Sequence, residues 1–291
     1  VRSSVKFLKQ YLREHPVDVI VTTGPPHSMH LIGRGLAKET GLPWIPDFRD
    51  PWTKIFYYKH LHLTKASDRK HHRLEKSVLD EADTVIAVSP LVQQEFQAMT
   101  KTPVALITNG FDDADFGSAV SRPKDSSRFV ITHTGLFADD GNPLTLWDAL
   151  AAKCSEDPAF DAALRIRLAG KVDAGIISAL EERGLSGKVD ALGYVSHDEA
   201  VAEQRAADIL ILPLRQEPEY RCVLPGKIFE YLAARRPVLG IGQEDGAAAQ
   251  ILSDTGAGIM YDWDKYDDIR AFIDGAWNDE VPAFNPAGID K

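Results

Sequence analysis

The sequence predicts an α/β fold built from two domains in tandem, each with a parallel sheet. Short apolar runs rich in β-branched residues, such as VDVIVTTG (17–24) and DILILPL (208–214), alternate with helical patterns. Continuous apolar strands separated by helices are typical of parallel sheets that helices cover on both faces. A polar stretch rich in helix and strand breakers interrupts the alternation, which then restarts. We therefore predict a Rossmann-like domain over residues 1–115, a linker over 116–128 and a second Rossmann-like domain over 129–291.

The first domain is expected to begin with an amphipathic helix. Val5, Leu8, Tyr11 and Leu12 follow one another at i, i+3, i+6 and i+7, which places them on one helix face. The apolar runs after this helix predict the strands of the first sheet, over residues 17–24, 43–50, 83–89 and 103–110.

The second domain is expected to hold a six-stranded sheet. Its apolar runs cover residues 128–135, 165–170, 188–196, 208–214, 237–242 and 257–262, with helices in the gaps. In sheets of this kind, ligands bind outside the carboxyl ends of the strands, where loops lead into helix N-termini. The residues that follow each strand are therefore the candidates for function.

Composition excludes several classes of protein. The chain has 291 residues and a net charge of −10, which argues against a nucleic-acid partner held on a broad basic face. The two cysteines, Cys154 and Cys222, are too few for a disulfide framework or a thiolate zinc site, so we expect a cytoplasmic protein. No apolar run reaches the length of about 18 residues that a membrane span needs. The histidines match no zinc motif, so we expect no metal and no cofactor.

The most informative motif is LPGKIFEYLAARRPVLGIG (224–242). Pro225 suits the first turn of a helix, and Gly226 lets a ligand approach the backbone. The free amides at this helix end, together with Lys227, predict an anion site. The carboxylate of Glu230 lies on the same helix face and suits two vicinal hydroxyls of a ribose. The alternative is a surface ion pair, which would contribute only about 0.2–0.5 kcal/mol.

A second motif, HTGLFADDGNP (133–143), follows another strand. Gly135 permits close approach to the backbone, and Asn142 is expected to cap a helix that begins at Pro143. An ordinary turn between a strand and a helix explains the same residues, so this alternative stays open.

The first domain has its own candidate loop, TTGPPHSMH (22–30). Ser28 is expected to cap the next helix, which places His27 at a helix N-terminus and at the carboxyl end of a strand. His27 would then serve as a base, a proton shuttle or a hydrogen-bond donor. The alternative is a capped turn with a solvated histidine, and this alternative is stronger for His30.

A fourth motif, DFRDPW (47–52), also ends a strand. Arg49 and Asp50 suit either a polar ligand or pairing with each other, and Asp50 also suits a cap of the turn before Pro51. The residues leave these interpretations equally open.

Together, these motifs and VITNGFD (106–112) resemble the family 4 glycosyltransferases of the GT-B type. The closest likeness is to the bacterial branch that builds cell-surface polysaccharides. The resemblance implies two facing Rossmann-like domains, of which the second binds a nucleotide-diphosphate sugar and the first mainly binds the acceptor. It also implies transfer with retention of the anomeric configuration and without an obligatory metal.

The resemblance assigns roles to residues by position. Glu230 resembles the ribose-binding glutamate of the family, and Lys227 resembles its basic residue on the phosphate side. His27 and Asp50 lie on the acceptor side and are the catalytic candidates, together with Lys227. The residues implied in donor binding are Gly135, Asn142, Gly170, Lys171, Val195, Ser196, His197, Gly226, Lys227 and Glu230.

The chain departs from the family pattern in three respects. Cys222 stands where the family often has an acidic residue, for which Glu217 or Glu219 would have to substitute. Gly141 stands where an arginine is common, and two aspartates precede it. The strands that open the family fold have no counterpart before the strand at 17–24, so we expect a fragment whose acceptor domain is incomplete.

We therefore predict a retaining glycosyltransferase of the hexosyltransferase type. It would move a sugar from a nucleotide-diphosphate sugar to a cell-surface polysaccharide or a lipid-linked acceptor. Such an acceptor would bring the protein to the inner face of the membrane, although no strongly basic amphipathic helix stands out in the sequence. Two alternatives stay open: a nucleotide-sugar epimerase of the same fold, and a nucleotide-sugar-binding module without turnover.

Overall fold

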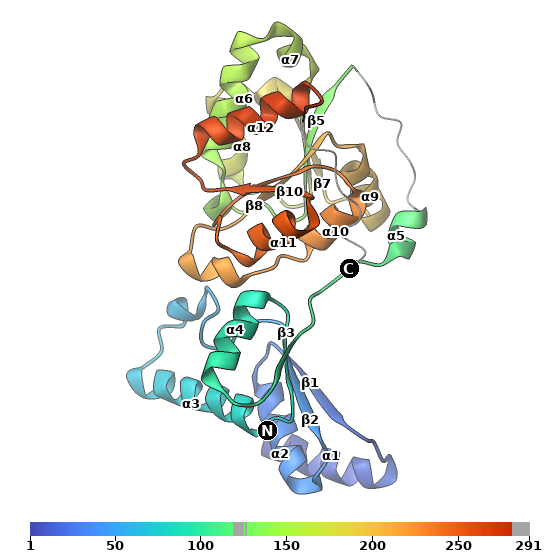
Figure 1. The fold of residues 1–291 in the computed structure, drawn as a ribbon, viewed down its shortest axis with the longest axis vertical. Coiled ribbons are helices and arrows are strands. Elements are labelled where there is room, and N and C mark those ends of the chain that lie inside the picture. The colour runs from blue at the N-terminus through green and yellow to red at the C-terminus, as the bar shows by residue number, and fades with distance from the viewer. Residues whose placement is uncertain (119–124, 126, 281–291) are drawn as a thin grey trace. The chain divides into compact units, whose positions relative to one another are not determined.

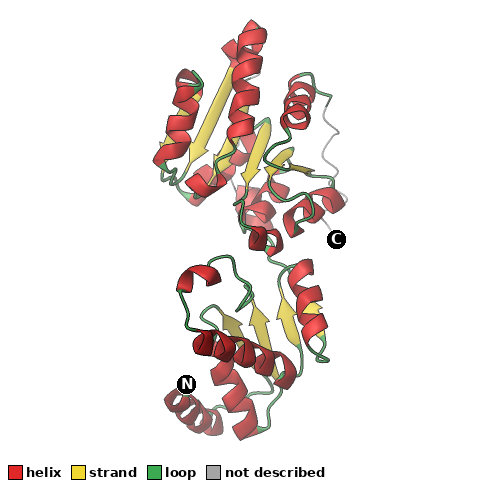
Figure 2. Cartoon of the chain, turned by 90° about the vertical axis from the view of Figure 1, so that its left-hand side faces the viewer, coloured by secondary structure: helices red, strands yellow, loops and turns green. Residues whose placement is uncertain are grey.

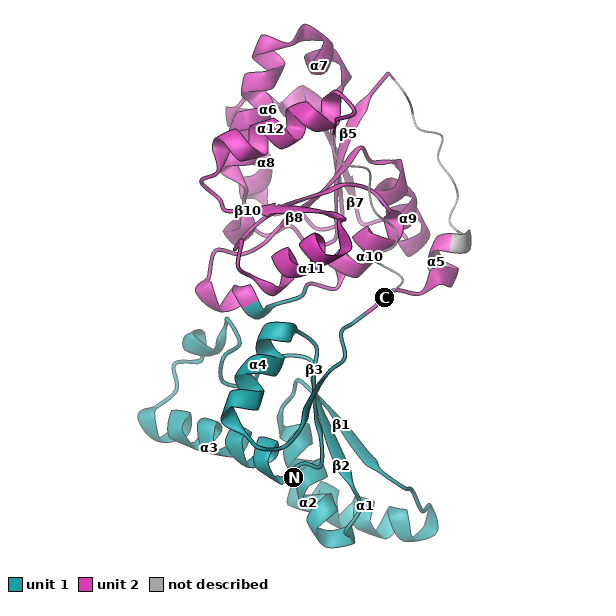
Figure 3. Ribbon diagram, in the orientation of Figure 1, with its two compact units in different colours: residues 1–109, 222–224 teal, residues 110–221, 225–291 magenta. Residues whose placement is uncertain are grey.

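The computed structural model describes residues 1–118, 125 and 127–280, which form two compact units (Figures 1 and 3). Unit 1 contains residues 1–109 and 222–224, and unit 2 contains residues 110–221 and those from 225 onward. The division therefore falls before the predicted boundary at 115. Helix α5 (Asp113–Ser118) includes the first residues of the predicted linker, because this segment packs against helices of unit 2. Most of that linker lies outside the described residues.

Unit 1 is a four-stranded parallel sheet in the order β1-β2-β3-β4. Each strand that we predicted in this part of the chain is present. Trp44 and Phe48, both fully buried, belong to the second strand and anchor the core of the unit. The elements are α1 (Arg2–Glu14), β1 (Ile20–Gly24), α2 (Ser28–Thr40), β2 (Trp44–Phe48), η1 (Tyr58–Leu61), α3 (Lys65–Glu81), β3 (Val85–Ala87), α4 (Pro90–Met99) and β4 (Val104–Leu106).

The predicted amphipathic helix at the start of the chain is α1. Val5, Leu8 and Leu12 are half-buried, as expected for a face that packs against α2. Tyr11, which we placed on the same face, is 47% exposed. Within the described residues, no helix is long and apolar enough to cross a membrane.

Unit 2 is a six-stranded parallel sheet in the order β10-β9-β8-β5-β6-β7, and helices flank its strands (Figure 2). All six predicted strands are present. The elements are β5 (Phe129–Thr134), η2 (Asp139–Gly141), α6 (Leu144–Glu156), α7 (Pro158–Ala163), β6 (Leu164–Ala169), α8 (Ala174–Glu182), η3 (Ser186–Lys188), β7 (Val189–Gly193), α9 (His197–Ala206), β8 (Ile209–Pro213), η4 (Pro218–Cys222), α10 (Lys227–Ala234), β9 (Val238–Ile241), α11 (Ala247–Thr255), β10 (Gly258–Tyr261) and α12 (Tyr266–Trp277).

The core of unit 2 packs against both faces of its sheet. Ile131 on β5 and Ile211 on β8 are fully buried, as are Leu146 and Trp147 on α6. Strands buried on both faces have little freedom to shift, because the packed side chains interlock. The loops at their carboxyl ends are therefore held on a rigid edge. The α/β fold class with two parallel sheets is confirmed.

Candidate functional site

Three neighbouring strands of unit 2 end on glycines with positive φ. Gly135 (φ +95°) follows β5, Gly170 (φ +121°) follows β6, and Gly193 (φ +66°) ends β7. The Gly135 N–H donates to the carbonyl of Ala169 at 2.8 Å, and the Gly170 N–H donates to the carbonyl of Gly193 at 2.7 Å. A Cβ on Gly170 would lie 2.3 Å from the Gly135 oxygen, so no side chain fits there. The carboxyl edge of these strands is therefore bare backbone, which a ligand can approach closely.

Lys227, the first residue of α10, lies beside this glycine edge. Its Nζ is 3.1 Å from the carbonyl oxygen of Leu136 and 3.2 Å from Nε2 of His133. A Cβ placed on Gly135 would lie only 3.7 Å from the same ammonium. Burial lowers the pKa of Lys227 to about 8, although the nearby carboxylate of Glu230 raises it. At neutral pH the side chain is a cation whose attraction for an anion is strengthened by partial burial.

His133 supports Lys227 from inside the sheet. Burial, and secondarily the charge of Lys227, lowers the pKa of His133 to about 3, so its ring is neutral. The neutral ring can donate from Nδ1 to the carbonyl of Ile211 at 3.3 Å and accept at Nε2 from the ammonium of Lys227. The sequence analysis did not select His133, although a histidine within an apolar strand was a signal for it.

Glu230 lies on α10 three residues after Lys227. Its Oε2 accepts from Nε2 of Gln204 on α9 at 2.9 Å, and that amide also lies 2.9 Å from Oγ1 of Thr134. Gln204 is fully buried, and the Thr134 N–H donates to the hydroxyl of Tyr231 at 3.0 Å. The carboxylate is therefore held by Gln204 of α9, whose amide is itself bonded to Thr134 of β5. A bond that links two helices in this way was not evident from the sequence, and Gln204 was missed.

The start of α10 differs in one respect from the prediction. The helix begins at Lys227, so Pro225 lies before it and not in its first turn. The carbonyl of Pro225 accepts from the N–H of Ile228 at 3.0 Å and that of Gly226 accepts from Phe229 at 3.2 Å, which shapes a tight entry to the helix. Gly226 is exposed at this entry.

A cavity of about 190 Å³ in unit 2 adjoins Lys227 and contains a second cation. Arg215, in the loop after β8, forms an ion pair with Asp140 at 2.5 Å. A Cβ on Gly141 would lie 3.3 Å from the carbonyl oxygen of Leu214, so a larger residue at that position would press on the backbone. Arg215, a residue that the sequence analysis missed, therefore places a cation on the cavity that Gly141 also lines. The lining residues are Leu136, Phe137, Ala138, Asp140, Gly141, Leu212, Pro213, Leu214, Arg215, Tyr220, Pro225 and Lys227.

Two predicted donor-binding residues use their side chains within the protein. Asn142 does not cap α6: its Oδ1 accepts from Nε1 of Trp147 at 2.8 Å, and its Nδ2 donates to the carbonyl of Gly175 at 3.3 Å. Ser196 accepts from the N–H of Glu199 in a capping box at the start of α9. A side chain engaged in this way is available to a ligand only after it releases its own partner.

The remaining predicted donor-side residues follow β6 and β7. Lys171 is exposed and its carbonyl accepts from the N–H of Phe137 at 2.9 Å. Val195 is half-buried, and His197 is exposed. These residues border the strand ends that carry Gly170 and Gly193.

Glu217 and Glu219, which we proposed as acidic substitutes for Cys222, have different surroundings. Cys222 belongs to unit 1 and packs against its core. Glu217 belongs to unit 2, where its carbonyl accepts from Nε2 of Gln243 at 3.0 Å. One carboxylate oxygen of Glu217 is buried without a hydrogen-bond partner among the described residues, which keeps it a candidate for a ligand contact. Glu219 lies within the short helix η4.

In unit 1, His27 lies at the carboxyl end of β1. It is the residue before α2, and Ser28 does not cap this helix, contrary to the prediction, because the helix already begins at Ser28. The His27 ring stacks on Trp52 with centroids 5.3 Å apart. Both ring nitrogens are buried without a hydrogen-bond partner among the described residues. Burial, with a smaller effect of His71, lowers the pKa of His27 to about 4, so the imidazole is neutral at pH 7.

His30 is a core residue, so neither the predicted functional role nor the alternative of a solvated histidine describes it. It is fully buried and stacks on Phe48 with centroids 4.3 Å apart. Its Nδ1 lies 3.1 Å from Oγ1 of Thr22, which also accepts from Nε1 of Trp44 at 2.9 Å. These contacts place His30 beneath the loop that carries His27.

The loop after β2 is fixed by a buried carboxylate. Glu75 on α3 is 1% exposed and accepts from the N–H of Trp52 at 2.9 Å and from Oγ1 of Thr53 at 2.5 Å. This bracing, which the sequence did not reveal, presents Trp52 to His27. Arg49 donates to Oδ1 of Asn109 at 2.6 Å. Burial raises the pKa of Asp50, while the charge of Arg49 lowers it.

The described part of the chain contains no cluster of metal-ligating side chains. No group of three or more His, Cys, Asp or Glu side chains within it is placed to hold a metal ion.

Two protein-family models match the chain. Residues 2–115 match the model described as Glycosyltransferase Family 4, and residues 128–278 match the model described as Glycosyl transferases group 1. The second match alone covers more than half of the chain. The chain belongs to this glycosyltransferase family. The glycine edge, Lys227 and Glu230 thus lie in the group 1 part of a glycosyltransferase, and His27 lies in the Family 4 part.

Solved structures of GT-B glycosyltransferases share the fold. HepE of Anabaena, solved in complex with UDP, has 18% identity and a TM-score of 0.71, over 98% of this chain and 76% of that chain. Sucrose-phosphate synthase of Thermosynechococcus elongatus has 18% identity and a TM-score of 0.68, over 98% and 71%. The lipopolysaccharide outer core galactosyltransferase WaaB has 15% identity and a TM-score of 0.66, over 99% and 74%. No curated protein sequence matches the chain.

Proposed function

We propose that this glycosyltransferase moves a sugar, with retention, from a nucleoside-diphosphate sugar to a glycan or lipid-linked acceptor of cell-surface polysaccharide synthesis. The observation that carries the proposal is the ammonium of Lys227 beside a side-chain-free glycine edge, with the carboxylate of Glu230 one helical turn further on. A diphosphate needs cations and close backbone approach, and a ribose needs a hydroxyl acceptor. The start of α10 and the glycine edge beside it together offer all three.

The donor would be bound by unit 2. Lys227 and Arg215 place two cations on the same cavity, which suits the charge of a diphosphate. Glu230, held by Gln204, accepts from the ribose hydroxyls. We propose UDP as the first nucleotide to test, because HepE, which shares the fold, is described in complex with UDP.

The transfer step breaks the bond between the anomeric carbon and the phosphate oxygen, and forms a bond from that carbon to the acceptor oxygen on the same face. The proton of the acceptor hydroxyl passes to the departing phosphate. Lys227 and Arg215 stabilise the negative charge that builds on that phosphate. On the acceptor side, the neutral ring of His27 has both nitrogens available for sugar hydroxyls, and Asp50 accepts a further hydrogen bond. We also propose that the protein works in the cytoplasm, peripheral to the membrane that carries the acceptor.

The decisive experiment measures nucleotide affinity calorimetrically for the wild type and for Glu230→Ala. Loss of one hydrogen bond to a charged group weakens binding by about 1.5–3 kcal/mol, or about 10-fold to 150-fold in Kd. Glu181→Ala, which removes an exposed carboxylate from α8, is the control and should leave Kd unchanged. Equal affinities of the wild type and Glu230→Ala would remove Glu230 from the site.

Product analysis then separates the alternatives. Incubation of a nucleotide sugar without acceptor would convert the donor sugar if the protein were an epimerase. Binding without transfer to any acceptor would instead identify a binding module.

A further inference from the structure

The charge of unit 1 is concentrated in one segment. Residues 54–76 contain seven Lys and Arg residues against two acidic residues, which gives a local charge of +5 within a chain of net charge −10. The rest of the chain therefore carries −15. Such an asymmetry marks a surface that attracts an anionic partner, even though the whole protein is acidic.

The positive charge forms a stripe on α3. Lys65, Arg69, Arg73 and Lys76 recur at i, i+4, i+8 and i+11, a spacing that places them on one face of the helix, and all four are exposed. We call these four residues the basic face of α3. The first three have no ion pair or side-chain hydrogen bond with any described residue. The sequence analysis did not identify this helix as basic and amphipathic.

The stability of the helix does not explain these cations. Lys65 and Arg69 lie in the first two turns, where the positive end of the helix dipole disfavours positive side chains. Asp68 is the acidic residue of the first turn that complements the dipole. An anionic partner outside the protein gives the cations a role that the fold does not.

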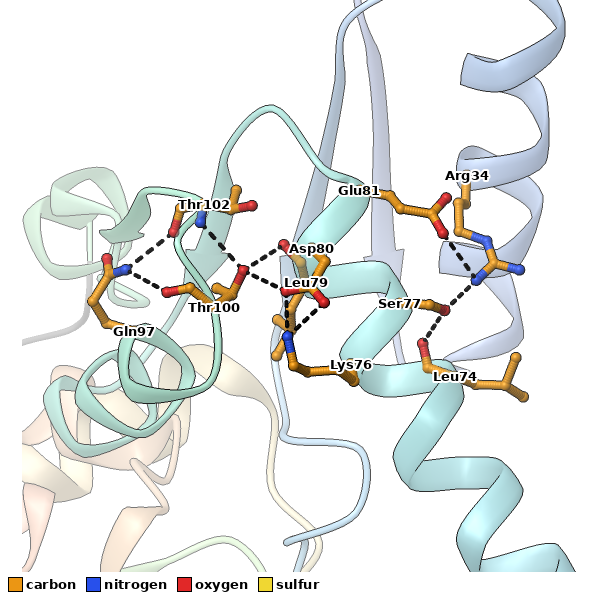
Figure 4. A network of polar contacts seen from close by, with 10 residues as sticks. All are labelled: Arg34, Leu74, Lys76, Ser77, Leu79, Asp80, Glu81, Gln97, Thr100 and Thr102. Carbon is orange, nitrogen blue, oxygen red and sulfur yellow. Dashed lines mark hydrogen bonds and ion pairs between the residues drawn. The ribbon is translucent and has the colours of Figure 1, made fainter.

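The second half of α3 differs from the first half, because its polar side chains are bonded to neighbouring elements (Figure 4). Lys76 pairs with Asp80, whose Oδ1 also accepts from Oγ1 of Thr100 at 2.9 Å. Ser77 accepts from Arg34 of α2 and donates to the Leu74 carbonyl. The C-terminal half is thus fixed in unit 1, whereas Lys65, Arg69 and Arg73 are exposed and have no side-chain partner in the part of the chain that the structure describes.

Exposed apolar groups lie in the segment that immediately precedes α3. Tyr57 is 38% exposed and Leu61 is 47% exposed, and both belong to the segment around η1. Tyr58 ties this segment to α3, because its hydroxyl donates to Oδ1 of Asp68 at 3.1 Å and its ring lies 5.9 Å from that of His71. Cations beside exposed aromatic and aliphatic groups are the combination that a lipid headgroup region accommodates. A soluble polyanion has no use for the apolar groups.

We propose that the basic face of α3, with Tyr57 and Leu61, binds the surface of an anionic phospholipid bilayer. The inner side of the same helix reaches the candidate acceptor site: the ring of His71 lies 5.9 Å from Trp52, which stacks on His27. Membrane binding would therefore bring His27 close to a lipid-linked acceptor. The approach of His27 to a lipid-linked acceptor rests on the proposed function, whereas the binding of α3 to a bilayer does not.

The test is co-sedimentation with phosphatidylcholine vesicles, with and without phosphatidylglycerol. The wild type should bind only the anionic vesicles. Lys65→Glu/Arg69→Glu/Arg73→Glu should bind them at least about 100-fold more weakly, since each basic residue near an anionic surface contributes about fivefold. The matched control, Arg2→Glu/Lys6→Glu/Arg13→Glu, reverses the same number of charges on α1, the other basic helix of unit 1, and should retain binding.

Each contrary result overturns the proposal. The proposal fails if the wild type ignores anionic vesicles, or if the α1 variant and not the α3 variant loses binding. Leu61→Ser should weaken vesicle binding several-fold; an unchanged affinity would indicate a purely electrostatic surface that fits a soluble polyanion and not a bilayer. UDP affinity of the wild type separates the two ideas. A wild type that binds UDP but not anionic vesicles contradicts only this inference, and one that binds anionic vesicles but not UDP contradicts only the proposed function.

Discussion

The two units each hold a histidine at the carboxyl end of a parallel strand, but in opposite states. In unit 2, His133 is fully buried and both ring nitrogens have partners in the protein. In unit 1, neither ring nitrogen of His27 has a partner among the described residues. Buried polar atoms without partners destabilise a fold, and they persist where a ligand completes them. The comparison teaches that unit 2 organises its site internally, whereas unit 1 leaves hydrogen-bonding capacity for a ligand.

The strongest test of internal organisation is Gly170→Ala. The added Cβ meets the Gly135 carbonyl at 2.3 Å and the residue is left at a φ of +121°, so clash and strain combine. We expect the free energy of unfolding of unit 2 to fall by about 3–5 kcal/mol in urea. Gly184→Ala is the control, since it has a φ of +72° with open space around it and should lose only about 1–2 kcal/mol. Equal losses would show that the glycine edge is not closely packed.

The next test replaces each histidine with phenylalanine. His133→Phe removes the acceptor of Lys227 and the donor to the Ile211 carbonyl, and should lower the free energy of unfolding by about 1–3 kcal/mol. His27→Phe loses no hydrogen bond and should change it by less than about 1 kcal/mol. Urea unfolding of both variants measures the difference. An equal loss for His27→Phe would mean that its nitrogens already have partners, and the contrast between the units would disappear.

The third test is a pH dependence at Lys227, whose effect is small near neutral pH. Its pKa of about 8 in the folded protein means that the ammonium is lost above pH 8, so affinity for UDP should fall by up to about tenfold per pH unit, or about 1.4 kcal/mol. In the absence of ligand, a rise in pH has the opposite effect on the free energy of unfolding. The unfolded chain, with a lysine pKa near 10.5, binds the proton more tightly, so stability should rise between pH 8 and 10.5.

Lys227→Arg provides the control for this titration. An arginine stays charged across the range, so both profiles should become flat where Lys227 causes them. Calorimetric titration with UDP gives the affinity, and urea unfolding gives the stability. A wild-type affinity that is constant from pH 7 to pH 10 would exclude Lys227 as the phosphate-binding cation.

The sequence predicted the strands well because parallel strands are continuous apolar runs that need no long-range information. It also selected Gly135, Lys227 and Glu230, because turn glycines and helix starts are local features. It missed Arg215, Gln204 and Glu75, since their roles depend on partners from distant parts of the chain. Such contacts exist only once the fold has formed.

The errors of the sequence interpretation share one cause. Asn142 and Ser28 were assigned caps from their residue types, but the structure bonds Asn142 to Trp147 and starts the helix at Ser28 itself. The basic face of α3 was obscured in the same way, since residue types were judged without knowing which side chains face outward. Local chemistry therefore identified candidates, and packing decided among them.

The glycine edge of unit 2 has a consequence for how this enzyme can diversify. Where a ligand meets only main-chain atoms, recognition does not depend on side chains, and mutation has nothing there to alter except the glycines themselves. Variation is then confined to the walls around it, such as the loop of Arg215 and the turn that ends at Gly141. Exchange of these wall segments between relatives offers a route to transferases that deliver a different monosaccharide while keeping the same nucleotide carrier.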